Sequence, residues 1–257
     1  MADLDLNVDA SIATLTLNRP AQRNAITLGM WLETAELLAE LSADKAVRAI
    51  LLAGAAGHFS VGADISEFGL VRASAQQAGD YEVAVDNASH AIAVCPKPTF
   101  AAISGYCLGG GCHLAMACDF RIVGPSASFG IPAAKLSIVY GVRSTQRLLS
   151  LVGLPAAKRI LYTAQLFDAD EAMRLGFVDD IASDPLTRAR EMALGMAANA
   201  PLSIAGAKSI LTGLSMGLGE LAEIEAQRAI DRAADSADYE EGHRAFAEKR
   251  APRFQGV

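Results

Sequence analysis

The chain has 257 residues, of which 52% are hydrophobic and 20% are charged, and its formal net charge is −7. This length and composition indicate a globular protein that can build a core without disulfides or metals. The acidic balance argues against a nucleic-acid or anionic-membrane surface, because both require a concentrated basic footprint. It leaves room for a small anionic ligand, since a few local cations can hold one phosphate group.

The N-terminal residues and the cysteines predict a soluble, cytoplasmic protein. The first residues, MADLDL, carry acids where a secretory signal carries lysine or arginine. The most apolar stretch, residues 91–122, is interrupted by proline, lysine and glycine, so no membrane-spanning segment is expected. The cysteines lack a CxxC spacing, and we interpret all four as buried reduced thiols rather than metal ligands: Cys95, Cys107, Cys112 and Cys118.

Hydrophobic periodicity predicts strands and helices that alternate in the first half of the chain. After about residue 145 the pattern is mostly helical, which indicates an α/β core followed by a helical C-terminal part. In chain order, the expected elements are a strand over 12–17, a helix over 28–41, a strand over 47–53, a helix over 81–94, a strand over 99–103, a helix over 109–118 and a strand over 120–123.

Two loops that follow buried strands contain closely spaced glycines. The first, HFSVGADISEF (58–68), leads into a short helix for which Asp64 and Glu67 have the spacing of a capping box. The second, SGYCLGGGCH (104–113), leads into a helix N-terminus, where unpaired N–H groups favour an anion. One N–H from each loop, aimed at one point, would form an oxyanion hole that stabilises charge on a carbonyl oxygen. Taken alone, each loop is better interpreted as a tight turn.

Together with further motifs in the same order, the two loops resemble the crotonase superfamily, also called the enoyl-CoA hydratase/isomerase family. The resemblance begins at NRPAQRNAI (18–26) and ends at EEGHRAFAEKRAPRF (240–254). It implies an α/β fold with a ββα spiral core over residues 1–195 that binds acyl-CoA. It also implies a helical region over residues 196–257 that mediates trimers, often paired into hexamers, and that contributes CoA contacts. The implied substrate is an acyl-CoA thioester, with no metal and no redox cofactor.

Matched residue by residue, the resemblance assigns the oxyanion hole to the backbone N–H groups of Ala63 and Gly110. It assigns CoA contacts to positions in three segments: Arg23, Ala25, Val61, Ala63, Phe246 and Lys249. For the last two, an ordinary solvated helix face is an equally good interpretation.

Two positions depart from the family pattern. Hydratases of the family use two glutamates to activate water and to deliver a proton to the α-carbon. This chain has His113 at one of these positions and Ala133 at the other. Because such a group contributes about a hundred- to ten-thousandfold in rate, we expect ordinary hydratase activity to be weak or absent.

Several side chains could supply a single acid or base instead. An unperturbed imidazole has a pKa of about 6.5, which makes His113 a candidate acid/base, with a packing histidine as the alternative. Tyr140 is a candidate proton donor or an aromatic wall of the acyl pocket. Asp86 and His90, four residues apart, fit a surface pair better than a catalytic pair. Arg143 is a weaker candidate for the mouth of the pocket.

Three functions stay open at this point. The leading hypothesis is an acyl-CoA enzyme that uses the oxyanion hole and at most one acid/base, as a decarboxylase, a thioester hydrolase, an isomerase or a weak hydratase. The second is a non-catalytic acyl-CoA binding protein. The third is a serine hydrolase, because GLSMG (213–217) matches G-x-S-x-G and Asp231 and His243 follow it. The helical pattern before Ser215 argues against that elbow.

Overall fold

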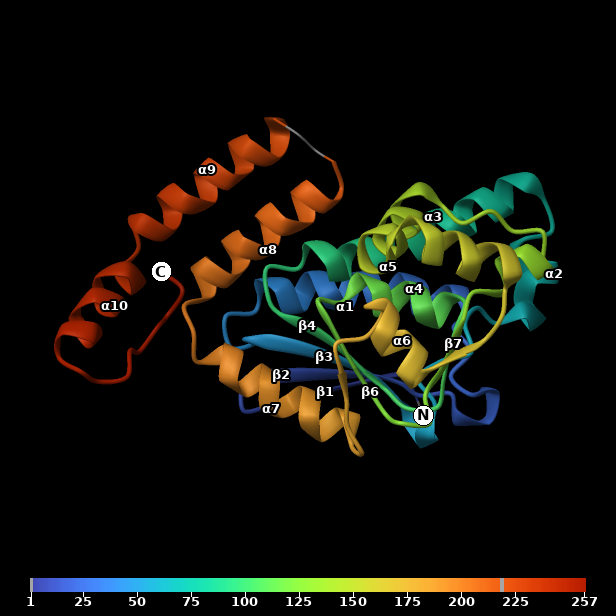
Figure 1. The fold of residues 1–257 in the computed structure, drawn as a ribbon, viewed down its shortest axis with the longest axis horizontal. Coiled ribbons are helices and arrows are strands. Elements are labelled where there is room, and N and C mark those ends of the chain that lie inside the picture. The colour runs from blue at the N-terminus through green and yellow to red at the C-terminus, as the bar shows by residue number, and fades with distance from the viewer. Residues whose placement is uncertain (1, 218–219) are drawn as a thin grey trace.

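The computed structural model describes residues 2–217 and 220–257 and has two sheets (Figure 1). Its strands are β1 (Leu4–Asp9), β2 (Ile12–Leu17), β3 (Ala49–Gly54), β4 (Thr99–Ile103), β5 (Tyr106–Leu108), β6 (Phe120–Val123), β7 (Ser128–Gly130), β8 (Phe167–Asp168) and β9 (Asp180–Ile181). The larger sheet has the order β1-β2-β3-β4-β6-β9, and only the β1–β2 pair in it is antiparallel. The smaller sheet has the order β5-β7-β8.

The helices account for most of the remaining chain. They are α1 (Leu28–Ala43), α2 (Phe68–Val71), α3 (Ala75–Val94), α4 (Gly110–Ala117), α5 (Val142–Thr163), α6 (Ala169–Leu175), α7 (Pro185–Ala197), α8 (Pro201–Ser215), α9 (Glu220–Ala234) and α10 (Ala237–Ala247). Short 3-10 turns lie at Pro20–Gln22, Ala55–Gly57, Ile65–Glu67 and Pro132–Lys135. None of the described helices is both long enough and apolar enough to cross a membrane.

Helices cover both faces of the larger sheet (Figure 1). In β3, Ile50 and Leu52 join the main core with residues of α1, α3 and α4, whereas Ala49 and Leu51 pack towards α7 in a second core. This is why residues 47–53 form a nearly continuous apolar run, interrupted only by Arg48: alternate side chains are buried on opposite faces.

The strands and helices expected from periodicity are confirmed, with boundaries shifted by a few residues. The structure adds β1, whose residues LDLNVD alternate between apolar and polar although only Leu4 of the six is buried. It also adds the short strands β5, β7, β8 and β9. The four cysteines are free and buried, as expected.

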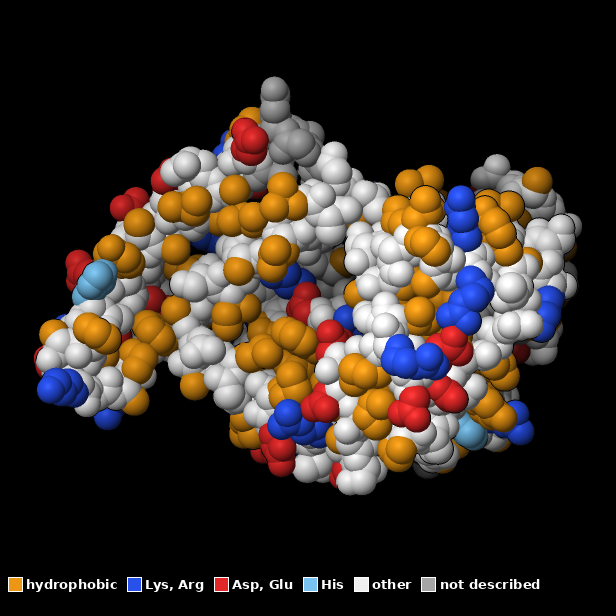
Figure 2. Space-filling view, viewed as in Figure 1, with side chains coloured by type: hydrophobic (Ala, Val, Ile, Leu, Met, Phe, Trp, Pro, Cys, Tyr) orange, Lys and Arg blue, Asp and Glu red, His pale blue; other side chains and the backbone are white. Residues whose placement is uncertain are grey.

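The last three helices extend away from the sheet as an arm (Figure 1). α8 packs against α3 and α9, and α10 packs against α9. At the base of the arm, the buried Lys208 of α8 donates to Asp119 Oδ2 at 2.8 Å and to the Lys97 carbonyl oxygen at 3.0 Å, which ties α8 to the core. Figure 2 shows hydrophobic side chains along α8 and α9, and large exposed ones on the arm include Leu211, Leu214, Ile224, Ile230 and Phe246.

Candidate active site

The two glycine loops predicted from the sequence meet at the N-terminus of α4. A Cβ atom added to Gly62 would lie 2.9 Å from the backbone nitrogen of Gly110, and one added to Gly110 would lie 3.2 Å from the backbone nitrogen of Ala63. Gly62 also has a φ of +95°, in the region that glycine adopts readily. Both the space and the backbone conformation therefore require glycine where the loops touch.

Ala63 and Gly110 each have an N–H that the surrounding secondary structure does not use. Gly110 is the first residue of α4, so its N–H has no acceptor within the helix. Ala63 forms a parallel bridge with Ile26, in which the Ile26 N–H donates to the Gly62 carbonyl and the Asp64 N–H donates to the Ile26 carbonyl, both at 2.8 Å. Because N–H directions alternate along an extended segment, the Ala63 N–H points away from Ile26. The two donors lie next to each other, as an oxyanion hole requires.

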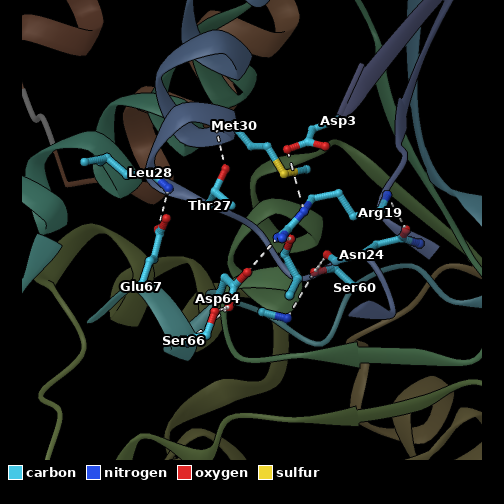
Figure 3. Close-up of polar contacts among 12 residues, drawn as sticks. Asp3, Arg19, Asn24, Thr27, Leu28, Met30, Ser60, Asp64, Ser66 and Glu67 are labelled. Carbon is cyan, nitrogen blue, oxygen red and sulfur yellow. Dashed lines mark hydrogen bonds and ion pairs between the residues drawn. The ribbon is translucent and has the colours of Figure 1, made fainter. Parts of the chain in front are cut away.

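A buried hydroxyl holds the first loop in place. Ser60 Oγ donates to the Asn24 carbonyl at 2.7 Å and accepts from the Gly62 N–H at 3.0 Å (Figure 3). The buried side chain of Asn24 donates in turn to the carbonyl oxygens of Ala55 and His58, at 2.9 Å and 2.7 Å. These bonds fix the backbone that precedes Ala63.

A second set of contacts fixes the backbone that follows Ala63. Arg19 Nη1 donates to Asp64 Oδ2 at 2.8 Å, and Asp64 Oδ1 accepts from the Ser66 N–H at 3.1 Å (Figure 3). The hydrogen bonds from Ser66 and Arg19 lower the pKa of Asp64. The expected capping box is wrong in its second half, because Glu67 Oε1 accepts from the Leu28 N–H at 2.6 Å instead. Glu67 thus joins the end of this loop to the start of α1.

A cavity of about 110 Å³ opens beside the two N–H groups. Six residues that the sequence analysis singled out line it: Val61, Ala63, Gly110, His113, Ala133 and Tyr140. Trp31, Arg72, Tyr81 and Glu82 also line it, and sequence reasoning missed them. Trp31 and Tyr81 follow the apolar periodicity of α1 and α3, which predicts burial but no site. Arg72 and Glu82 have no such signal in the sequence. A larger cavity of about 560 Å³ lies between the core and the arm and contains none of the predicted site residues.

His113 is buried in a polar pocket behind this cavity. Its Nε2 lies 2.9 Å from Ser89 Oγ, and Ser144 Oγ lies 3.2 Å from both ring nitrogens. Asp86 Oδ1 is 3.8 Å away, and Arg147 donates to Ser89 Oγ at 3.0 Å. Burial, with a smaller effect from Arg147, lowers the pKa of His113 to about 3. The imidazole is therefore neutral at pH 7.

Tyr140 contacts the loop that carries Gly110. Its hydroxyl donates to the Gly109 carbonyl at 2.9 Å, and its ring centroid lies 5.8 Å from that of His113. Burial raises the pKa of Tyr140 well above its ordinary value, so the phenol keeps its proton. A protonated hydroxyl thus lies at the cavity and supports the residue that precedes α4.

The structure brings together only some of the residues expected to contact CoA. The Val61 N–H donates to the Arg23 carbonyl at 3.2 Å, which places Arg23, Ala25 and Val61 beside Ala63. Phe246, 87% exposed, and Lys249 belong to the end of the arm. Figure 1 shows α10 and α2 at opposite ends of the molecule, so these two residues lie far from the cavity of the same chain.

The serine-hydrolase hypothesis is wrong. GLSMG forms the end of α8 rather than a turn between a strand and a helix, and Ser215 Oγ donates to the Thr212 carbonyl at 2.9 Å. Asp231 accepts from Gln227 within α9, and the ring of His243 packs against Tyr239 within α10.

The remaining candidates lie at the edge of the site. Asp86 is directed to His113, whereas His90 is exposed on the same helix, so the two do not act as a catalytic pair. Arg143 is exposed in the first turn of α5 and does not line the cavity. Within residues 2–217 and 220–257, no three His, Cys, Asp or Glu side chains gather in a way that could hold a metal ion.

Comparison with known proteins shows the family to which the chain belongs. The model of the enoyl-CoA hydratase/isomerase family matches residues 7–257. A short-chain-enoyl-CoA hydratase from Clostridium acetobutylicum is 33% identical over 95% of this chain and 94% of its own length. A crotonyl-CoA hydratase from Syntrophomonas wolfei is 34% identical over 97% and 96%.

Solved structures show the same fold. An enoyl-CoA hydratase/carnithine racemase from Magnetospirillum magneticum superposes with a TM-score of 0.93 at 36% identity, covering 100% of this chain and 97% of that one. The chain therefore belongs to the enoyl-CoA hydratase/isomerase family and has the fold of the crotonase superfamily.

Proposed function

We propose that this protein is an acyl-CoA enzyme that binds the thioester carbonyl between the N–H groups of Ala63 and Gly110. The observation that carries the proposal is the close approach of two unused backbone donors beside a cavity. Preorganised donors of this kind stabilise the negative charge of an enolate or a tetrahedral intermediate, and each contributes about a hundred- to a thousandfold in rate. The CoA moiety is part of the substrate, and the proposal includes no metal or redox cofactor.

Ordinary hydration is not the reaction that this site favours. Both positions where family hydratases carry glutamate, His113 and Ala133, line the cavity, and neither offers a carboxylate. With a pKa of about 3, His113 is also neutral at pH 7 and does not act as an imidazolium acid. In this proposal its neutral ring shapes the cavity.

Tyr140 supports decarboxylation as the preferred reaction within this proposal. Loss of CO₂ from a malonyl-type thioester leaves its electron pair on the α-carbon as an enolate, whose oxygen the two N–H groups stabilise. The α-carbon then takes one proton, and a protonated phenol lies at the cavity. The reaction thus requires an oxyanion hole and one acid, without a base that activates water. Thioester hydrolysis and isomerisation are the alternatives.

A panel of thioesters tests the proposal. The purified protein is incubated with crotonyl-CoA, methylmalonyl-CoA and butyryl-CoA, and the products are identified by mass spectrometry. We expect conversion of methylmalonyl-CoA to propionyl-CoA and little hydration of crotonyl-CoA. Free CoA as the main product would favour hydrolysis. Tight binding of all three thioesters without any product would identify a non-catalytic acyl-CoA binding protein.

The arm suggests how Phe246 and Lys249 could still contact CoA. They lie far from the cavity of their own chain, so such a contact requires the arm of another copy. Exposed apolar side chains on α8 and α9, such as Leu211, Leu214 and Ile230, support a packed interface. We propose a homotrimer or a pair of trimers, which light scattering tests directly. A monomer in solution would contradict this part of the proposal.

A further inference from the structure

The lining of the cavity contains an ion pair where α2 and α3 approach each other. Arg72, which ends α2, donates from Nη1 to Glu82 Oε1 of α3 at 2.7 Å. Most neighbouring positions in the lining are apolar, including Ile65, Phe68 and Val85. A charged pair in a cavity suited to hydrocarbon indicates that this end of the cavity recognises something other than an alkyl chain.

The two members of the pair are held very differently. The guanidinium carbon of Arg72 lies 4.9 Å from the ring centroid of Phe68 and 5.1 Å from that of Tyr81. These contacts leave the Arg72 side chain only 16% exposed, whereas that of Glu82 is 46% exposed. The cation is therefore fixed between aromatic rings, while the carboxylate has access to water. Glu82 can turn into solvent, because water already reaches its half-exposed carboxylate and can hydrate it once the pair opens.

Two aromatic side chains connect this cation to the oxyanion hole. Tyr81 Oη accepts from Trp31 Nε1 at 3.0 Å. The indole of Trp31 lies against α4, since a Cβ atom added to Gly110 would be 2.9 Å from Trp31 Cζ2. An acyl group whose carbonyl sits at Gly110 can thus extend along Trp31 and Tyr81 and end near Arg72.

We propose that Arg72 selects acyl groups that end in a carboxylate. The terminal carboxylate of the substrate takes the place of Glu82 on the guanidinium, and Glu82 moves into water. The planar guanidinium group of Arg72 has several N–H donors, whose geometry matches the two oxygens of a carboxylate. This inference rests on the proposed function, because the thioester carbonyl must lie at Ala63 and Gly110.

Binding of three saturated thioesters tests the inference: glutaryl-CoA, its neutral ω-amide and hexanoyl-CoA. The single tryptophan, Trp31, lines the cavity, so its fluorescence reports occupancy. We expect the wild type to bind glutaryl-CoA about tenfold more tightly than the amide, as a charge-assisted hydrogen bond provides. Arg72→Gln should abolish this preference and leave hexanoyl-CoA binding within about threefold.

Two further variants sharpen the result. Glu82→Gln removes the competing carboxylate and should increase the preference for glutaryl-CoA over the amide by about threefold. Arg228→Gln, at an exposed position of α9, is the matched control and should leave every affinity unchanged.

The possible outcomes separate this inference from the proposed function. Equal affinity of the wild type for glutaryl-CoA and its amide would overturn the inference and leave the proposed function intact. An equal loss of affinity for all three thioesters in Arg72→Gln would also overturn the inference, because the ion pair would then stabilise the structure without recognising the acyl group. Failure of every thioester to bind the wild type would contradict the proposed function itself, and the inference with it.

Discussion

A Cβ atom on Gly110 would lie 3.2 Å from the backbone nitrogen of Ala63, although 47 positions separate the two residues in the sequence. This close approach joins a loop after β3 to the first turn of α4. It is the feature from which the proposed chemistry follows, because it brings the backbone nitrogens of Ala63 and Gly110 close to each other.

Gly110→Ala should disable the site. The new methyl group would lie 2.9 Å from Trp31 Cζ2 and 3.2 Å from the backbone nitrogen of Ala63, so α4 and the first loop have to move apart. Loss of one oxyanion donor costs about a hundred- to a thousandfold in rate, so turnover of the preferred thioester should fall by about that factor. Gly195→Ala in α7 is the control, since its methyl group would meet no atom within 4 Å. Equal activity of the two variants would contradict the assignment of Gly110.

Returning both glutamates should create hydratase activity. In the double variant His113→Glu/Ala133→Glu, carboxyl groups occupy two positions that line the cavity. Because an acid/base group contributes at least about a hundredfold, crotonyl-CoA hydration should rise by that factor or more over the wild type. The pair His113→Gln/Ala133→Gln, which has the same shape without the acid, should show no gain. An equal increase of crotonyl-CoA hydration in both double variants would show that proton transfer by the glutamates does not cause the increase.

His113 should make stability depend on pH. Its pKa is about 3 in the folded protein and about 6.5 in the unfolded chain. Between these values the unfolded chain binds a proton that the folded protein does not, so stability is full above pH 6.5 and falls as the pH is lowered towards 3. Between pH 7.5 and pH 5, the wild type should lose about 2 kcal/mol more than His113→Gln in urea unfolding. The same loss in both proteins would exclude His113 as the cause.

Tyr140→Phe should separate turnover from binding. The hydroxyl that is removed donates to the Gly109 carbonyl at 2.9 Å and is the proposed proton donor. Turnover should fall about a hundredfold. The affinity for butyryl-CoA should change by less than about tenfold, which is the contribution of one hydrogen bond to binding. Tyr162→Phe, at a 72% exposed position, is the control. Unchanged turnover in Tyr140→Phe would remove the phenol from the mechanism.

The fold was largely predictable where a local pattern determines burial. β2, β3 and β4 show the periodicity of buried strands, and the two glycine loops contain both proposed oxyanion donors. The pair of Arg72 and Glu82 was not predictable, because it depends on how α2 packs against α3.

The environment of His113 was hidden for a similar reason. Its neutral state depends on burial and, to a smaller extent, on Arg147 of α5. Ser89 of α3 and Ser144 of α5 contact its ring nitrogens. From the sequence alone, only the unperturbed pKa of a histidine can be assigned. The shift in pKa depends on how completely tertiary packing removes water from the imidazole.

The stretching frequency of a bound thioester carbonyl tests the central claim most directly. Butyryl-CoA labelled with ¹³C at the carbonyl is measured by isotope-edited infrared spectroscopy, free and bound to the wild type. Two N–H donors polarise the carbonyl, so we predict a shift to lower frequency that is lost in Gly110→Ala and kept in Gly195→Ala. A bound carbonyl with the frequency of free butyryl-CoA would contradict an oxyanion hole at Ala63 and Gly110.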